Sequence, residues 1–245
     1  MKTTNNTILI TGGGSGIGYE MAKLFSENNN TVIITGRNEK RLQEAVSKLN
    51  NVHYIVSDVT NENEIDSLVE KVKSEYPNLN ILINNAGRAI LHDLTQENAN
   101  AFESALDEIS TNYLSVIRLT EKLLPVLSKK DEAAVVNISS VAALVASHKL
   151  STYSASKAAL HSYTQSLRHF LKDSKIKVFE VMPPLVNTEF SKEIGGEKGI
   201  HPNVVANDLF NGLSNNRFEI HVGDTAAIYQ LSLTSPKEAY DLMNN

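Results

Sequence analysis

Tyr153 and Lys157 are the residues of this chain whose types and spacing most directly suggest chemistry. They stand four positions apart in the segment YSASK, so on a helix their side chains would share one face. A free tyrosine has a pKa of about 10 and is a poor base at neutral pH. A lysine ammonium beside it would lower that pKa, so the pair could exchange a proton with a ligand. Because so short a motif also arises by chance, its meaning depends on its surroundings.

Ser140 provides the first such surrounding feature. It follows an apolar run at 133–139 that we expect to be a strand, and it precedes Tyr153 by 13 residues. Open α/β sheets bind ligands at the carboxyl ends of their strands. A hydroxyl there could donate a hydrogen bond to a substrate carbonyl oxygen. The alternative is a serine that merely ends a strand.

A glycine-rich turn, TGGGSGIG at 11–18, follows the first expected strand and leads into a helical pattern. Glycines let the backbone bend sharply and approach a phosphate closely. The N-terminus of the next helix offers free N–H groups and the positive end of its dipole. The spacing is TGxxxGxG, with Gly12, Gly16 and Gly18, and no Gly-Lys-Ser/Thr follows, which excludes a Walker loop. At this place in a βαβ series it predicts a dinucleotide site.

The end of the second expected strand bears on which dinucleotide is bound. An acidic residue there would accept the ribose hydroxyls and select NAD, but this chain has Gly36 followed by Arg37. Arg37 could pair with a 2′-phosphate, so NADP(H) is favoured and NAD(H) is the alternative. The competing interpretation is a solvated arginine that opens the next helix. The glycine turn itself has Ser15 and no second basic residue that could contact the phosphate.

These residues require a particular arrangement of strands and helices. Short β-branched runs predict strands at 7–11, 31–35, 52–57, 79–84, 133–139, 176–181 and 218–222. Helical patterns lie between them at 16–28, 39–49, 61–75, 99–128, 152–172 and 203–214. This alternation predicts a doubly wound, Rossmann-type parallel α/β sheet of about seven strands with helices on both faces. An antiparallel α+β fold would need hairpin turns, and none is evident.

Neither linker nor repeat interrupts the chain, so we expect one domain over 1–245. The glycine-rich segment 190–202 lacks apolar periodicity, and we expect it to be either a lid over the substrate site or an ordinary solvated loop.

Composition excludes several classes of protein. The chain has 245 residues, 41% hydrophobic and 21% charged, which excludes wholesale disorder. A net charge of −5 argues against a nucleic-acid-binding module. The chain has no cysteine, hence no disulfide and no thiolate site, and no histidine pair has metal-binding spacing. We therefore expect no bound metal. Because no signal-like start and no apolar run of membrane-spanning length is present, we also expect a cytoplasmic protein without a membrane span.

Taken together, the chain resembles the short-chain dehydrogenase/reductase family in its simple type of about 250 residues. The resemblance rests on a series of motifs in the family's order: the TGxxxGxG turn, Asp58-Val59, the NNAG segment at 84–87, Asn112, Ser140, Tyr153 with Lys157, and the segment 183–188. Each motif alone is modest, whereas the ordered set spans nearly the whole chain. The family resemblance implies the Rossmann-type fold and an oxidoreductase activity.

The resemblance implies four catalytic positions. Tyr153 would be the general acid in carbonyl reduction and the base in alcohol oxidation, while Ser140 polarises the carbonyl. Lys157 would lower the pKa of Tyr153 and bind the nicotinamide ribose. Asn112 would hold a water in the proton path. Without the family, Asn112 and Asp58 could equally be ordinary surface polar residues.

It also implies the cofactor contacts. The turn residues, the end of the second strand, the loops after the third and fourth strands and the segment after the sixth would surround the dinucleotide. They are Gly12, Gly14, Ser15, Gly16, Ile17, Gly18, Arg37, Asp58, Val59, Asn85, Ala86, Gly87, Tyr153, Lys157, Pro183, Val186 and Thr188.

One position departs from the family pattern. Where the family has Pro-Gly after the sixth strand, this chain has Pro183-Pro184, and the second proline removes a backbone donor and stiffens the turn. The double proline and the SPK segment at 235–237 resemble the branch encoded beside lipoteichoic-acid D-alanylation genes.

The sequence therefore predicts an NADP(H)-dependent oxidoreductase that interconverts a small-molecule carbonyl and alcohol. The alternative is a non-catalytic dinucleotide sensor or scaffold, although such proteins typically lose the tyrosine or lysine that this chain keeps. The resemblance also implies a homodimer or homotetramer built through the helices near 99–128 and 152–172. Apolar candidates for the substrate pocket are Leu144, Leu150, Leu185, Phe190 and Ile194.

Overall fold

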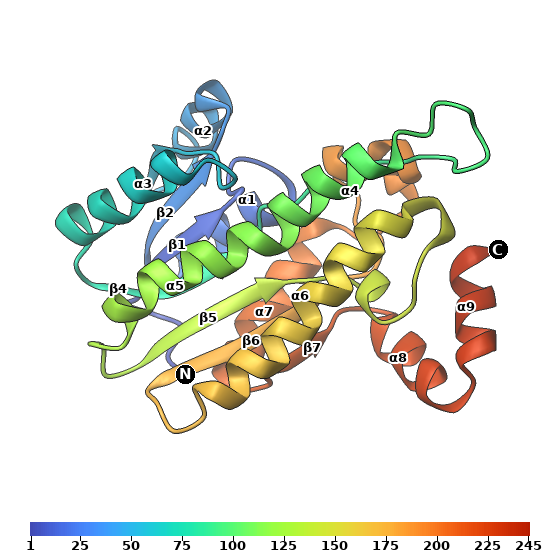
Figure 1. Ribbon diagram of the computed structural model, residues 1–245. Coiled ribbons are helices and arrows are strands. Elements are labelled where there is room, and N and C mark those ends of the chain that lie inside the picture. Colours follow the sequence, from blue (N-terminus) through green and yellow to red (C-terminus); the bar gives the residue numbers. More distant parts are fainter.

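Seven parallel strands form one sheet in the order β3-β2-β1-β4-β5-β6-β7 (Figure 1). The computed structural model describes residues 1–245. Its strands are β1 (Thr7–Thr11), β2 (Thr31–Gly36), β3 (Val52–Val56), β4 (Leu79–Asn84), β5 (Ala133–Ile138), β6 (Ile176–Met182) and β7 (Glu219–His221). The chain builds outward from β1 to β3 and then in the other direction from β4 to β7. The predicted doubly wound α/β fold is confirmed.

The longer helices flank this sheet, and short helical turns lie between the longer elements. The α-helices are α1 (Gly16–Glu27), α2 (Glu39–Val46), α3 (Glu62–Glu75), α4 (Ala101–Ile109), α5 (Ser115–Leu127), α6 (Ser151–Phe170), α7 (Pro202–Ser214), α8 (Thr225–Thr234) and α9 (Pro236–Asn244). The short turns are η1 (Ser110–Leu114), η2 (Val141–Ala143), η3 (His148–Leu150), η4 (Glu189–Ile194) and η5 (Gly196–Lys198). None of the helices has both the length and the apolar character needed to cross a bilayer.

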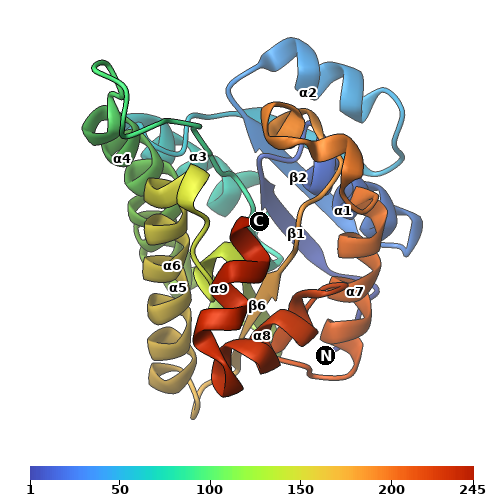
Figure 2. The same ribbon diagram turned by 90° about the vertical axis from the view of Figure 1, so that its right-hand side faces the viewer.

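Two apolar cores lie on opposite faces of the sheet, as Figure 2 shows by the separation of α1 and α7 from α5 and α6. One core takes Phe25 from α1 and Leu209 from α7, and the other takes Leu123 from α5. Along β1, Ile8 enters the first core and Leu9 the second. The strands are therefore apolar at successive positions because both faces are covered, which is why they lack strict alternation.

The structure differs from the sequence-based elements in two places. The single helical segment expected over 99–128 is divided into α4 and α5 by the π-helical turn η1, which carries Asn112. The terminal helices α8 and α9 were not expected. Each buries only one side chain, Thr225 and Ala239. The apolar residues of α8 are spread around the helix, so no one-sided pattern reveals it, whereas those of α9 do gather on one side and the sequence analysis missed them.

Phe25 offers a test of the first core. Its ring is fully buried and lies 5.7 Å from the ring of Phe210, measured between centroids. We expect Phe25→Ala to lower the free energy of unfolding by about 3–5 kcal/mol, measured by urea denaturation. Phe170→Ala is the matched control, because that ring is 83% exposed and its removal should change stability little. Equal effects of the two variants would contradict this packing.

Candidate active site

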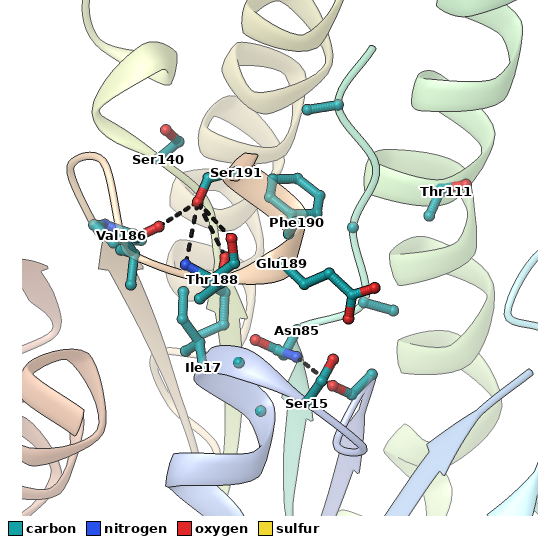
Figure 3. Close-up of a pocket in the computed structure, with 18 of the residues that line it drawn as sticks. Ser15, Ile17, Asn85, Thr111, Ser140, Val186, Thr188, Glu189, Phe190 and Ser191 are labelled. Atoms are coloured by element: carbon teal, nitrogen blue, oxygen red, sulfur yellow. Dashed lines mark hydrogen bonds between the residues drawn. The ribbon is translucent and has the colours of Figure 1, made fainter. Parts of the chain in front are cut away.

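The carboxyl ends of the central strands open into one cleft of about 970 Å³. Every residue predicted from the sequence to be catalytic or to contact the cofactor lines this cleft, except Asn112. The loop that follows β6 covers one side of it, and Figure 3 shows Phe190 and Glu189 of that loop beside the opening. The parallel topology thus gathers residues from nearly the whole chain at one edge of the sheet.

Ser140 and Tyr153 lie together where β5 ends. Ser140 is extended and begins η2, with its hydroxyl accepting a hydrogen bond from the Ala142 N–H at 3.1 Å. Tyr153 lies in the first turn of α6, and both side chains are nearly buried. The ring of Phe190 lies 6.3 Å from that of Tyr153. The phenol is therefore shielded from bulk water within the cleft.

Burial is the largest influence on the pKa of Tyr153. It raises the pKa of Tyr153 to about 12, a rise to which the Glu108 carboxylate adds and which a hydrogen bond with Ser140 opposes. The net shift is therefore opposite to the lowering expected from Lys157. The Lys157 Nζ lies 5.7 Å from the tyrosine ring centroid, and desolvation of the phenolate is the largest influence on the pKa.

Lys157 is also held by the strand end. Its Nζ donates a hydrogen bond to the Ile138 carbonyl oxygen at 2.8 Å, and only 4% of the residue is exposed. Burial lowers the pKa of this lysine to about 8, while the negative charge of Glu180 raises it. Lys157 and Tyr153 share the inner face of α6, as their spacing predicts.

Asn112 lies behind the wall of the cleft, in the π-helical turn. Its Oδ1 accepts the Arg88 N–H, and its Nδ2 donates to the Arg88 carbonyl and to the Ser156 hydroxyl, all at 2.8 Å. These bonds join the loop after β4 to α6. Asn112 is the buried residue of the π-helical turn.

The glycine turn has the backbone conformation that its residues predict. Gly12 and Gly16 have φ angles of +66° and +54°, which favour glycine. A Cβ atom on Gly18 would lie 2.3 Å from the Gly12 carbonyl oxygen. Asn85 holds the turn by donating from Nδ2 to the carbonyls of Thr11 and Gly12, at 2.9 and 3.1 Å. The loops after β1 and β4 are therefore one rigid unit.

Two arginines border the same end of the cleft. Arg37 is 67% exposed, and its Nη1 lies 4.0 Å from the Asp58 carboxylate. Arg41, which the sequence analysis missed, lines the cleft and pairs with Glu189 at 2.9 Å. Asn38 caps α2 by accepting the Arg41 N–H, which fixes Arg41 in the first turn of that helix. The available signal was a second arginine four residues after Arg37, in the first turn of the helix predicted at 39–49.

The loop after β6 is pinned at its base. Val186 forms a parallel bridge with Ile200, and the Ile200 N–H donates to the Leu185 carbonyl at 3.0 Å. Figure 3 shows the Ser191 hydroxyl bonded to Val186 and Thr188. Within the segment expected to be irregular, η4 and η5 are short helical turns. Thr188 is thereby placed against Gly16 of the glycine turn.

Comparison with known proteins agrees with this geometry. The model of the short chain dehydrogenase family matches residues 6–199. This chain belongs to the short-chain dehydrogenase/reductase family. It is 42% identical over 200 residues, 82% of the chain and 79% of the relative, to the "Uncharacterized oxidoreductase DltE" of Bacillus subtilis. That relative is a dlt-operon protein, in agreement with the predicted branch. An uncharacterized oxidoreductase of Staphylococcus epidermidis is 29% identical over 216 residues, 87% of the chain and 93% of the relative.

Solved structures of the same family share the fold. A short-chain dehydrogenase/reductase from Burkholderia phymatum in complex with NAD has a TM-score of 0.88 at 21% identity, covering 100% of this chain and 97% of that one. A short-chain dehydrogenase from Burkholderia cenocepacia in complex with NADP also has a TM-score of 0.88, at 22% identity, covering 99% of each chain. The oxidoreductase family and its Rossmann-type architecture, both predicted from the sequence, are confirmed.

The raised pKa of Tyr153 can be measured in this dehydrogenase/reductase. We expect the Tyr153 phenol to remain neutral at pH values where exposed tyrosines, with a pKa of about 10, ionise. The tyrosinate absorbance of the unmodified protein minus that of Tyr153→Phe should show almost no signal between about pH 9 and 11. Tyr240→Phe, at an exposed tyrosine outside the cleft, serves as the control. A difference signal with a midpoint at or below that of exposed tyrosine would show that Lys157 dominates after all.

Proposed function

We propose that this protein is an NADP(H)-dependent oxidoreductase that interconverts a carbonyl and an alcohol, with Tyr153 as general acid and base. The observation that carries the proposal is the single cleft in which Ser140, Tyr153 and Lys157 face the glycine turn. Family membership supports the reaction class. The placement of a hydroxyl, a phenol and an ammonium at one strand end supports these three residues as the catalytic group.

The glycine turn fits the pyrophosphate of a dinucleotide. Ser15 precedes α1 without bonding to its N–H groups, and no acidic residue lies in the first turn of that helix. These N–H groups and the positive end of the helix dipole suit an anion. When bound, the nicotinamide ring would supply or accept the hydride.

Other residues of the cleft would hold the rest of the cofactor. Asp58, Val59 and the segment 85–87 line the cleft and would contact the adenosine, and Lys157 would bind the nicotinamide ribose. Pro183, Val186 and Thr188 also line the cleft and would contact the nicotinamide. The Val141 N–H donates to the Pro183 carbonyl at 2.9 Å, which ties this segment to the end of β5. Pro184 stiffens the turn that follows, as the sequence predicts.

In carbonyl reduction, Ser140 would donate a hydrogen bond to the substrate oxygen, and Tyr153 would give that oxygen its proton as the hydride reaches the carbon. The raised pKa keeps Tyr153 protonated and ready to act as the acid at neutral pH. In alcohol oxidation, the same phenol would have to be deprotonated, at a cost that the Lys157 cation and bound cofactor must offset. Asn112 would contribute by holding the loop that carries Arg88 and, as in the family, a water of the proton path.

The substrate side of the cleft is largely apolar. Leu150, Leu185, Phe190, Ile194 and Met243 line it. Leu144, also a sequence candidate, is not part of this lining. We infer a small-molecule substrate with an apolar body beside its carbonyl, covered by segment 190–202 acting as a lid.

Exposed apolar side chains support the proposed dimer or tetramer. Phe102 and Leu106 on α4 are 71% and 46% exposed, and Leu114 at the end of η1 is 51% exposed. They lie within one of the two helical segments, near 99–128 and 152–172, through which the sequence analysis expects copies of this chain to associate. A homo-oligomer would bury them.

The role of Tyr153 is tested by removing one oxygen atom. We expect Tyr153→Phe to lower kcat by about a hundredfold or more, because the proton donor is lost while the ring is kept. Cofactor affinity, measured by fluorescence titration, should change little. Tyr163→Phe is the control and should retain activity. Turnover by Tyr153→Phe at the level of the unmodified enzyme would refute the assignment. If the unmodified protein binds the cofactor but turns over no carbonyl or alcohol, the alternative of a non-catalytic dinucleotide sensor or scaffold is favoured.

Cofactor preference is tested at the end of β2. An arginine contact with a 2′-phosphate contributes about 1.5–3 kcal/mol, so we expect NADPH to bind about ten- to a hundredfold more tightly than NADH. Arg37→Ala and Arg41→Ala should each reduce this ratio, and Gly36→Asp should reverse it by repelling the phosphate. Arg118→Ala, which removes an exposed arginine near Glu62 outside the cleft, is the control. Equal or tighter NADH binding by the unmodified protein would overturn the proposal.

A further inference from the structure

A buried carboxylate that no motif points to lies directly beneath the active site. Glu180 is on β6, and none of its surface is exposed. Its oxygens accept hydrogen bonds from the Ser139 hydroxyl at 2.5 Å and from His161 Nδ1 at 2.9 and 3.0 Å. A buried charge is costly unless it is paired and hydrogen-bonded, and these two partners meet that requirement.

The hydrogen bonds of Glu180 end at the residues that hold the catalytic group. Ser139 immediately precedes Ser140, and Ile138 supplies the carbonyl that binds Lys157 Nζ. His161 is four residues after Lys157 on α6, so the two side chains project from the same face toward the sheet. Strands β5 and β6 pair with Ile138 opposite Val181. Glu180 is thus linked on one side to the strand end that carries Ser140 and on the other to α6.

The surrounding charges leave Glu180 as the main negative influence on Lys157. On α6, Arg168 pairs with Glu219 of β7 at 2.8 Å, and the Gln165 amide lies 3.1 Å from His161 Nε2. His221 of β7 stacks on Tyr229. The groups that act on the charge of His161 are Glu180, Glu219 and Arg168. Those that act on His221 are Glu219, Glu180, His161 and Arg217, and the group that acts on Lys157 is Glu180.

We propose that Glu180 is a positioning residue of the hydride-transfer site: held by His161, it fixes the Ser139–Ser140 strand end and maintains the positive charge of Lys157. This inference rests on the proposed function. Its charge opposes the burial that lowers the pKa of Lys157 to about 8. A neutral residue at 180 would let that pKa fall further, and the enzyme would lose the Lys157 cation at a lower pH.

His161 and Glu180 also predict how the pair responds to pH. The hydrogen bond to Glu180 raises the pKa of His161 above its ordinary value, and partial burial opposes this rise. A raised folded-state pKa means that the stabilisation is complete below the unfolded value of about 6.5 and is lost as pH rises through the folded value. In Glu180→Gln the histidine should titrate at a lower pH.

The decisive experiment compares the pH dependence of three variants with that of the unmodified enzyme. In Glu180→Gln, which keeps the shape of the side chain and removes its charge, the alkaline limb of kcat/KM should move down by about one pH unit. In His161→Gln it should not move down, because the carboxylate remains. Ser139→Ala should lower kcat and leave the limb in place. Thermal unfolding of each variant identifies a change that comes only from loss of folding.

Two readouts keep the inference separate from the proposed function. NADPH affinity followed against pH reports the Lys157 cation without turnover. As the pH rises, this affinity should begin to fall at a lower pH in Glu180→Gln than in the unmodified protein. Magnetic resonance titration of His161 reports its pairing with Glu180 without any ligand. Suppose that the unmodified enzyme turns over its substrate and that folded Glu180→Gln shows an unshifted alkaline limb of kcat/KM. That result would overturn the inference and leave the proposed function intact. If no substrate is turned over, an unshifted pH dependence of NADPH binding would overturn it equally.

Discussion

Parallel pairing of β1, β4, β5 and β6 is the constraint on which the rest of this structure depends. Because each of these strands runs in the same direction, the loops that follow them meet at one edge of the sheet. The glycine turn, the segment 85–87, Ser140 and the segment 183–188 become neighbours for that reason alone. Helices on both faces keep the strands buried, and this burial gives the apolar runs that identify the fold class.

Hydrogen bonds between the loops convert this meeting point into a rigid site. Asn85 bonds to the backbone of the glycine turn, and Asn112 bonds to the backbone of Arg88 and to Ser156 on α6. Ser191 performs a similar role beneath Thr188. In each case a buried or half-buried polar side chain satisfies backbone groups that no strand or helix satisfies, so the loops remain ordered without regular structure.

Burial sets the electrostatic character of the site. It raises the pKa of Tyr153 and lowers that of Lys157, so the protein alone favours a neutral phenol and weakens the charge of the lysine. Burial therefore keeps the proton on Tyr153 in the resting protein and makes its phenolate costly in either direction of the reaction. Glu180 opposes the effect on Lys157, and His161, on the same face of α6 as Lys157, pairs with the carboxylate. The ionisation of the catalytic group therefore depends on residues one layer behind it.

The sequence by itself determined the fold class, the strands, the glycine turn and the family, because each follows from local periodicity, backbone freedom or ordered motifs. All the catalytic and cofactor-contact residues that it predicted line the cleft, apart from Asn112, which lies behind the wall. Only the tertiary structure decided the direction of the Tyr153 pKa shift, the place of Arg41 and Met243 in the cleft, and the bonds of Glu180 with His161 and Ser139. Desolvation and charge interactions act through space between segments far apart in the chain, and no local pattern of residues encodes those distances.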